Sequence, residues 1–178
     1  MDSINQQQPE KNHEDLAGAE AGKKIKELVD KSNTCYFCTK ITTGEPLTVR
    51  PMSVQKVDEE GNLWFLSPDD SHKNAEIQGD NRVQLLFQGS EFSGFLSIYG
   101  TATVSRDKER IKELWEPTLK TWFTEGVDDP RITVVKVDTQ QGYYWDNKHG
   151  NAVTLVKMAA GAILGKTLDD SIEGKLTV

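Results

Sequence analysis

The segment Ser67–Ile77 gathers several side chains that suit an anion. It follows a run typical of a strand and opens a short helix for which Ser71 is a good N-cap. A phosphate placed there would meet unpaired backbone N–H groups at the positive end of the helix dipole, the hydroxyls of Ser67 and Ser71, and the ammonium of Lys73. The segment is therefore a candidate phosphate cradle. The alternative is that Ser71 only caps a surface helix and Lys73 is solvated, and spacing alone favours that alternative.

Arg50, Pro51 and Met52 form a second candidate, inside a segment that otherwise reads as a β-strand. Pro51 cannot donate to a β-ladder, so it indicates an edge strand or a bulge. An arginine held beside such an irregularity could contact a phosphate through two parallel hydrogen bonds. The backbone groups exposed between Pro51 and Val54 could hydrogen-bond the polar edge of a flat heterocycle. A plain edge strand with a surface arginine is an equally weighted alternative.

Aromatic side chains form the third candidate, at Tyr143, Tyr144 and Trp145. A ring at a strand end could cover a bound ring system, although a core aromatic is the more frequent explanation. No residue of the chain presents itself as a general base or a nucleophile, so no catalytic role is assigned.

The two cysteines, Cys35 and Cys38, have the spacing of a redox pair but lie in a strand-like run. A redox pair needs a helix N-terminus to lower one thiol pKa, and strand residues three apart face opposite sides. We therefore interpret both as small strand side chains, with at most one in the core. The histidines His13, His72 and His149 are scattered, so no metal site is expected.

Seven segments have the alternation and the flanking turns of β-strands. They are Thr34–Ile41, Pro46–Val57, Asn62–Ser67, Val83–Gln88, Ser93–Val104, Arg131–Val137 and Gly142–Trp145. An amphipathic helix is expected over Asp15–Lys31 and a second over Arg106–Phe123, divided at Pro117. Val153–Gly165 suits either a strand or a helix. We predict a mainly β fold of six or seven antiparallel strands in a closed or nearly closed barrel, with peripheral helices.

Size and composition limit the class of protein. With 178 residues, 36% hydrophobic and 28% charged, the chain suits one domain at residues 15–178 behind a disordered polar tail at residues 1–14. It has no apolar run near the ~20 residues of a membrane helix and no secretory signal, so a cytoplasmic location is expected. A net charge of −7 disfavours nucleic acid and anionic lipid as partners.

The order of these motifs resembles the pyridoxamine 5′-phosphate oxidase-like FMN-binding split barrels. The matching segments are Arg50–Gln55, Trp64–Ser67, Ser71–Lys73, Val83–Gln88, Ile98–Gly100 and Tyr144–Trp145. The segments Trp115–Pro117, Trp122–Phe123, Gly126, Asp128–Pro130 and Tyr144–Asp146 are similar to the branch called general stress protein 26. The resemblance runs from about Leu16 to the end of the chain and implies a split barrel.

The resemblance implies a cofactor, FMN, with FAD as the second option. It implies that Arg50, Ser71 and Lys73 hold the FMN phosphate and that Ser67 adds a hydroxyl contact. His72 stands where the oxidases carry an arginine, which would remove one partner of the phosphate.

The resemblance also implies how the flavin ring is bound. The main chain of Pro51 and Met52 runs along the flavin, and Gln55 reaches the ring edge, where the oxidases usually have a lysine. Trp145 matches an aromatic residue that comes from the second protomer to wall the site. A homodimer with two equivalent sites at a two-fold interface is therefore expected.

The chain departs from the oxidases directly after Trp145. The oxidases carry an Arg-x-His segment there that grips the pyridoxal substrate, whereas this chain continues through Asp146–Asn151 without it. A substrate phosphate is not desolvated without replacement donors, so oxidation of pyridoxamine phosphate is not expected. The expected function is a flavin-binding stress-response protein. An oxidoreductase of unknown substrate and a non-enzymatic sensor or storage module stay open, and a barrel that has lost its cofactor is a third alternative.

Overall fold

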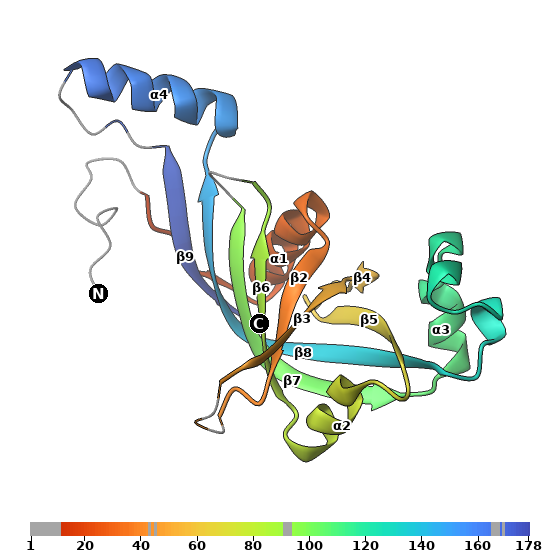
Figure 1. The fold of residues 1–178 in the computed structure, drawn as a ribbon. Coiled ribbons are helices and arrows are strands. Elements are labelled where there is room, and N and C mark those ends of the chain that lie inside the picture. The colour runs from red at the N-terminus through yellow and green to blue at the C-terminus, as the bar shows by residue number, and fades with distance from the viewer. Residues whose placement is uncertain (1–11, 43, 45, 91–93, 165–167, 169) are drawn as a thin grey trace.

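The computed structural model describes residues 12–42, 44, 46–90, 94–164, 168 and 170–178. Within them, nine strands form one sheet in the order β1-β9-β8-β7-β6-β2-β3, while β5 pairs with β4 and β8 off this path (Figure 1). The strands are β1 (Leu16–Ala17), β2 (Thr34–Thr39), β3 (Thr48–Ser53), β4 (Lys56–Val57), β5 (Leu63–Pro68), β6 (Arg82–Gln88), β7 (Phe95–Ser105), β8 (Ile132–Asn147) and β9 (Ser171–Thr177). The helices are α1 (Ala19–Lys31), α2 (His72–Gly79), α3 (Lys108–Leu114) and α4 (Asn151–Leu164), with the 3-10 turns η2 (Pro117–Thr121) and η3 (Gly126–Asp128).

The long strand β8 joins the two ends of the molecule (Figure 1). Its first part pairs with β5, where Thr133 lies opposite Ser67. Its last part pairs with β9, where Trp145 lies opposite Glu173. Residues near the start and the end of β8 therefore belong to different ends of the fold.

The predicted mainly β fold with peripheral helices is confirmed, but the predicted strand count and barrel closure are wrong. The described residues form nine strands rather than six or seven, and β1 runs parallel to β9 rather than antiparallel. Residues 132–137 and Gly142–Trp145 belong to one strand, β8, because β7 pairs with it from Val134 to Trp145 across the expected gap. Pro46–Val57 separates into β3 and β4, and β9 adds a strand in the last residues.

The barrel stays open at β3, which ends the strand order with β2 as its neighbour. Pro51 lies in this edge strand, opposite Tyr36 of β2, the kind of position in a sheet where prolines are found. After Ser53 the chain leaves β3, and Lys56 and Val57 pair with β5 instead. The interpretation of Pro51 as an edge-strand proline therefore agrees with the fold.

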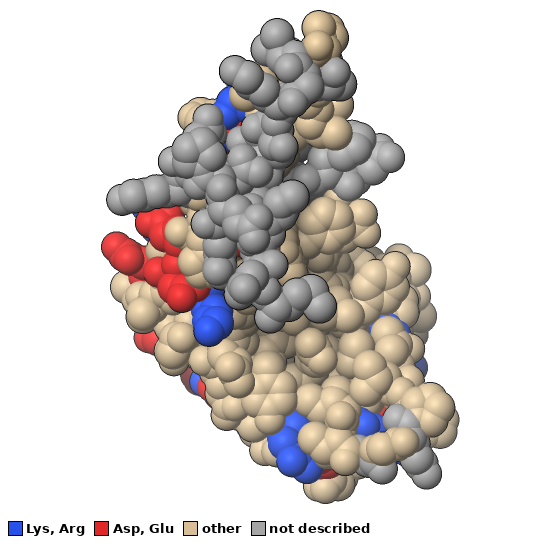
Figure 2. Space-filling view, turned by 90° about the vertical axis from the view of Figure 1, so that its left-hand side faces the viewer, with Lys and Arg blue, Asp and Glu red and all other residues tan. Residues whose placement is uncertain are grey.

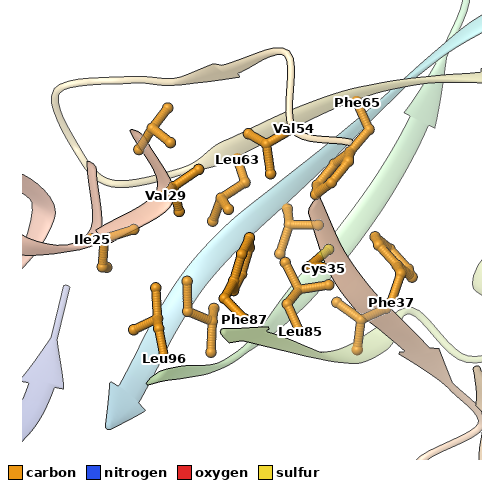
Figure 3. Packing of buried hydrophobic residues seen from close by; sticks show 14 of the residues in the cluster. Ile25, Val29, Cys35, Phe37, Val54, Leu63, Phe65, Leu85, Phe87 and Leu96 are labelled. Carbon is orange, nitrogen blue, oxygen red and sulfur yellow. The ribbon is translucent and has the colours of Figure 1, made fainter. Parts of the chain in front are cut away.

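The main core lies between the curved sheet and α1. Ile25 and Val29 of α1 point toward Leu63, Phe87 and Leu96 from the sheet (Figure 3). Burial of this stripe explains why the apolar spacing produces a helix here. The helix begins at Ala19 rather than at Asp15, because Leu16 and Ala17 pair with β9.

The peripheral helices follow the expected pattern. α3 and η2 occupy the segment predicted as helical, and Pro117 divides them. α4 occupies most of the stretch that suited either strand or helix, and it projects beyond the end of the sheet (Figure 1). No helix of the described residues combines the length and apolar character needed to cross a membrane.

Residues 1–11 of the predicted polar tail lie outside the described residues. The last tail residues lie beside β9. The backbone N–H of Glu14 donates to the carbonyl of Glu173 at 2.9 Å, and the N–H of Glu173 donates to the carbonyl of Asn12 at 3.0 Å. Contact with the sheet therefore begins before Asp15.

Candidate functional site

The side chains predicted to form a phosphate cradle lie together at the start of α2. Ser71 is the N-cap of this helix, and its side chain accepts a hydrogen bond from the backbone N–H of Asn74. Lys73 is only 3% exposed, and its Nζ donates to the hydroxyl of Ser67 and, at 3.3 Å, to the hydroxyl of Ser71. The alternative in which Lys73 is a solvated surface residue is therefore wrong.

Burial and a nearby cation lower the pKa of Lys73 to about 8. Removal from water is the larger cause, the positive charge of Arg50 adds to it, and Glu76 opposes it. The hydrogen-bond acceptors of Lys73 are neutral oxygens, those of Ser67, Ser71 and Asn74. A buried ammonium with neutral partners beside a second cation is an environment that an anion would stabilise.

Arg50 reaches the cradle from β3. Its Nη2 donates to Oε2 of Glu76 at 2.7 Å, and its Nη1 donates to the hydroxyl of Thr39 at 3.3 Å. The positive charge of Arg50 also acts on Lys73 and helps to lower its pKa, so the two cations lie close together. Arg50 and the cradle therefore lie on the same side of the molecule.

Glu76 balances part of the positive charge. Burial opposes its ionisation, but hydrogen bonds from Thr39 and Arg50 outweigh burial and lower the pKa of this carboxyl. Arg50 pairs with this carboxylate, and Lys73 feels its charge without bonding to it, so the two cations leave an excess of positive charge for an anion.

An apolar cleft of about 330 Å³ opens between β3, the end of β5 and η2. It is lined by Thr34, Pro51, Met52, Ser53, Gln55, Leu66, Pro68, Leu119, Trp122 and Phe123. Pro68 connects the cleft to the cradle, since its carbonyl accepts from the backbone N–H of Ser71 at 3.2 Å. Gln55 donates from Nε2 to the carbonyl of Ser53 at 3.0 Å. A cleft of this size with apolar walls can hold a flat ring.

Two predicted site residues, Trp145 and His72, do not line the cleft. Trp145 follows Thr133, the partner of Ser67, by twelve positions along β8, which is about 40 Å of strand. It is 43% exposed and contacts Tyr143, with ring centroids 4.5 Å apart. His72 is exposed and lines a neighbouring hollow with Lys40 and Glu76. The structure thus brings together seven of the nine predicted residues.

Sequence reasoning missed Thr39, Asn74 and Glu76 at the cradle. Asn74 and Glu76 follow Lys73 on α2. Their place on the predicted helix, close to Ser71 and Lys73, could have indicated that both lie at the cradle. The pairing of β2 with β3, where Phe37 lies opposite Arg50, brings Thr39 beside Arg50. Trp122, which follows η2 and is 64% exposed, was noted only for its resemblance to the stress-protein branch. Nothing in the sequence indicated that it lines the cleft.

Cys35 and Cys38 are both buried, so the expectation of at most one core cysteine is wrong. β2 has neighbours on both edges, and both of its faces are covered at these positions. Burial raises the pKa of Cys35 to about 12, so this thiol is not a nucleophile at neutral pH.

The chain belongs to the pyridoxamine 5′-phosphate oxidase-like family, because the sequence model of that family matches residues 20–169. This confirms the family expected from the motifs. A curated relative, Protein bli-3 of Neurospora crassa, is 26% identical over 129 residues, which cover 67% of this chain and 62% of that protein. The match therefore spans less than two thirds of that relative's length.

Solved structures with the same fold include several stress proteins. A candidate general stress protein 26 from Jannaschia sp. CCS1 has a TM-score of 0.74 and 21% identity, covering 88% of this chain and 97% of that one. The general stress protein 26 of Bacillus anthracis has a TM-score of 0.60 and 20% identity, covering 69% and 92%. The general stress FMN/FAD binding protein of Xanthomonas citri has a TM-score of 0.58 and 23% identity, covering 68% and 84%. These similarities show the fold.

Proposed function

We propose that this chain is an FMN-binding protein that forms a homodimer. The observation that carries the proposal is that Arg50, paired with Glu76, and the buried Lys73 lie within electrostatic reach of each other beside the apolar cleft. The cradle offers cations and hydroxyls to a phosphate, and the cleft offers apolar walls to a ring. The Xanthomonas citri neighbour, named an FMN/FAD binding protein, supports the same class of cofactor.

The donor set fits a phosphate. A dianion between Arg50 and Lys73 would offset their repulsion and favour the charged form of Lys73, since its present partners are neutral. Ser67 is fully buried, so the cradle is closed at its inner end. A closed cradle suits the terminal phosphate of FMN better than the longer diphosphate of FAD. Bound FMN would supply the electron or hydride transfer.

The residues of the cleft would bind and orient the ring. Pro51 and Met52 supply an edge of the sheet whose backbone can run along the flavin, and Gln55 supplies an amide for its polar edge. Leu119 and Trp122 would exclude water from one side. His72 lines an adjoining hollow together with Glu76, at the border of the proposed phosphate site.

Trp145 would complete the site from a second copy of the chain. It lies too far along β8 to reach the cleft of its own chain. A two-fold dimer resolves this, since each copy would then wall the site of the other. This is the basis for proposing a homodimer.

The binding affinities of two flavins test the cradle: FMN carries the phosphate, and riboflavin lacks it. The variants are Lys73→Met and Arg50→Ala, with Lys26→Met, an exposed lysine of α1, as the control. Quenching of flavin fluorescence should show each cradle variant weakening FMN by about tenfold or more, while riboflavin changes little. The control should match the parent protein. Equal affinity of the parent protein for FMN and riboflavin would refute the cradle.

The use of the flavin is a separate question. None of the residues that line the cleft is titratable, so the protein offers no acid or base there beyond the flavin itself. An oxidoreductase whose bound FMN accepts a hydride directly fits this lining, and so does a sensor or storage module without turnover. Anaerobic mixing of the loaded protein with NADH or NADPH separates them: bleaching of the flavin absorbance within seconds supports the oxidoreductase, and no bleaching supports the module.

A further inference from the structure

Most of the described apolar side chains of α4 are exposed, including Val153 at 37% and Met158 at 52%. Buried Thr154 and Gly161 lie on the side facing the rest of the chain. The residues of the opposite side, which we call the outer face of α4, recur at helical spacing. It consists of Ala152, Leu155, Val156, Ala159 and Ile163, all of which are exposed. Leu155 is 51%, Val156 70% and Ile163 84% exposed, which reverses the arrangement expected of a helix packed on its own domain.

Polar contacts, rather than this apolar face, hold α4 on its own chain. Asp170 is fully buried and accepts hydrogen bonds from Nδ1 of His149 at 2.7 Å and Nζ of Lys157 at 2.8 Å. The backbone N–H of His149 also donates to Asp170, at 3.0 Å. The hydroxyl of Thr154 also donates to Asp170, at 3.5 Å. These contacts fix the helix and leave its outer face available to another surface.

A second copy of this chain offers a matching surface. Its apolar cleft has Trp122 at 64% exposure together with Leu119 and Met52. α4 starts six positions after Trp145, within about 20 Å along the chain. A dimer that brings Trp145 to the partner's cleft therefore brings α4 to the same place.

We propose that the outer face of α4 packs against the apolar cleft of a second copy and covers the ring end of its flavin site. The inference rests on the proposed function, because the in-trans role of Trp145 sets which surface α4 meets. It assigns α4 a role beyond the family motifs: a wall that contributes Leu155 and Val156 to the partner's site. By two-fold symmetry the contact occurs twice in each dimer.

The charge of α4 favours a protein partner over a membrane surface. Lys157 is its one charged residue, and this lysine is bonded to Asp170. Helices that lie on membranes typically carry several lysines or arginines on their polar face. On the face shown in Figure 2, the described surface is largely uncharged, with acidic residues gathered at one border and separate lysine or arginine patches beside them and near the lower end. Such a surface suits burial against a second copy.

Cross-linking tests the contact directly. Cys35 and Cys38 are buried, so an added surface cysteine is the accessible thiol. Val156→Cys chains are mixed with Thr121→Cys chains, which carry the thiol beside Trp122, and are treated with a short bis-maleimide. A cross-linked heterodimer is expected in higher yield than from either variant alone. Absence of this product, with the dimer intact in light scattering, would overturn the contact.

A charged outer face tests the consequence for the flavin site. The double variant Leu155→Asp, Val156→Asp should be monomeric and should bind FMN and riboflavin about tenfold or more weakly, with their affinity ratio unchanged. Lys23→Glu changes the net charge by the same amount on an exposed face of α1 and should leave both properties unaltered. Circular dichroism and Tm verify that the double variant folds. A double variant that stays dimeric with unchanged affinity overturns the inference.

Two results separate this inference from the proposed function. If the parent protein binds no flavin while the cross-link forms, the cofactor assignment fails and the α4 contact stands. If FMN binds with the cradle dependence described above but α4 variants alter only binding to phosphatidylcholine–phosphatidylserine vesicles, α4 is a lipid-binding helix and the inference is wrong.

Discussion

Lys73 is buried and gives its hydrogen bonds to neutral oxygens. A buried charge with neutral partners destabilises the ligand-free fold, because its pKa of about 8 lies below the ordinary 10.5. Residues that lower the stability of the ligand-free protein in this way are typical of binding sites. We interpret the position of Lys73 as one that stabilises the protein fully only with an anion in the cradle.

The first prediction concerns the stability of Lys73→Met without ligand. Methionine keeps the apolar stem and removes the buried charge, so the free energy of unfolding at pH 7 should rise by roughly 1–3 kcal/mol. Urea unfolding at pH 7 measures it. Lys26→Met, which removes an exposed ion pair with Asp30, should shift the value by less than about 0.5 kcal/mol.

The pH dependence of the same variant follows from the direction of the pKa shift. Between about pH 8 and 10.5 the unfolded chain retains the proton that folded Lys73 has released, so this group makes stability rise with pH in that window. The advantage of Lys73→Met over the parent protein should therefore shrink from pH 8 to 10.5. An advantage that is constant across this window would contradict a buried, deprotonating lysine.

At the scale of elements, the turn from β8 through α4 to β9 is organised by Asp170. Burial opposes ionisation of this carboxyl, but hydrogen bonds from His149 and Lys157 outweigh burial and hold its pKa at about 2. Its stabilising contribution is present above the ordinary value of 3.8 and is lost as the pH falls toward 2. α4 should therefore loosen in acid before the main core unfolds.

Asp170→Asn tests the role of this carboxylate. Loss of the charge weakens two ionic hydrogen bonds, so the free energy of unfolding should fall by about 1–3 kcal/mol. Amide hydrogen exchange should accelerate mainly in α4. Asp30→Asn is the control, since Asp30 is exposed and pairs only across the surface of α1 with Lys26. Equal protection of α4 in parent protein and variant would show that other contacts hold the helix.

At the scale of the whole molecule, the length of β8 separates the cradle from Trp145, and a dimer is proposed to bring them together. Subunit mixing gives a prediction that depends on this geometry. In a heterodimer of Arg50→Ala and Trp145→Ala chains, one site carries both defects and the other carries neither. The mixture should therefore recover tight FMN binding at half of the sites in heterodimers, although each variant alone binds weakly.

If Trp145 completed the flavin site of its own chain instead, the mixing experiment would give a different result. Every site in the same heterodimer would then carry one defect, and mixing would recover nothing. Fluorescence titration of separately tagged chains, purified as heterodimers, measures the outcome.

The sequence alone determined features that depend on neighbouring residues. The helix cap at Ser71, the edge position of Pro51 and the break at Pro117 follow from backbone geometry and local hydrogen bonding, which short segments carry with them. The apolar stripe of α1 followed from side-chain period in the same way. The motif order also sufficed to predict the family.

Only the tertiary structure decided features that depend on pairing between distant segments. The meeting of Arg50 with Glu76 and Thr39 requires the register of β2 with β3 and the placement of α2. The continuity of β8 requires partners on both sides, and the outward turn of α4's apolar face requires a fold that anchors its polar side. Each depends on contacts between residues far apart in the sequence. The spacing of residues within one segment carries no information about these contacts, so it could not predict them.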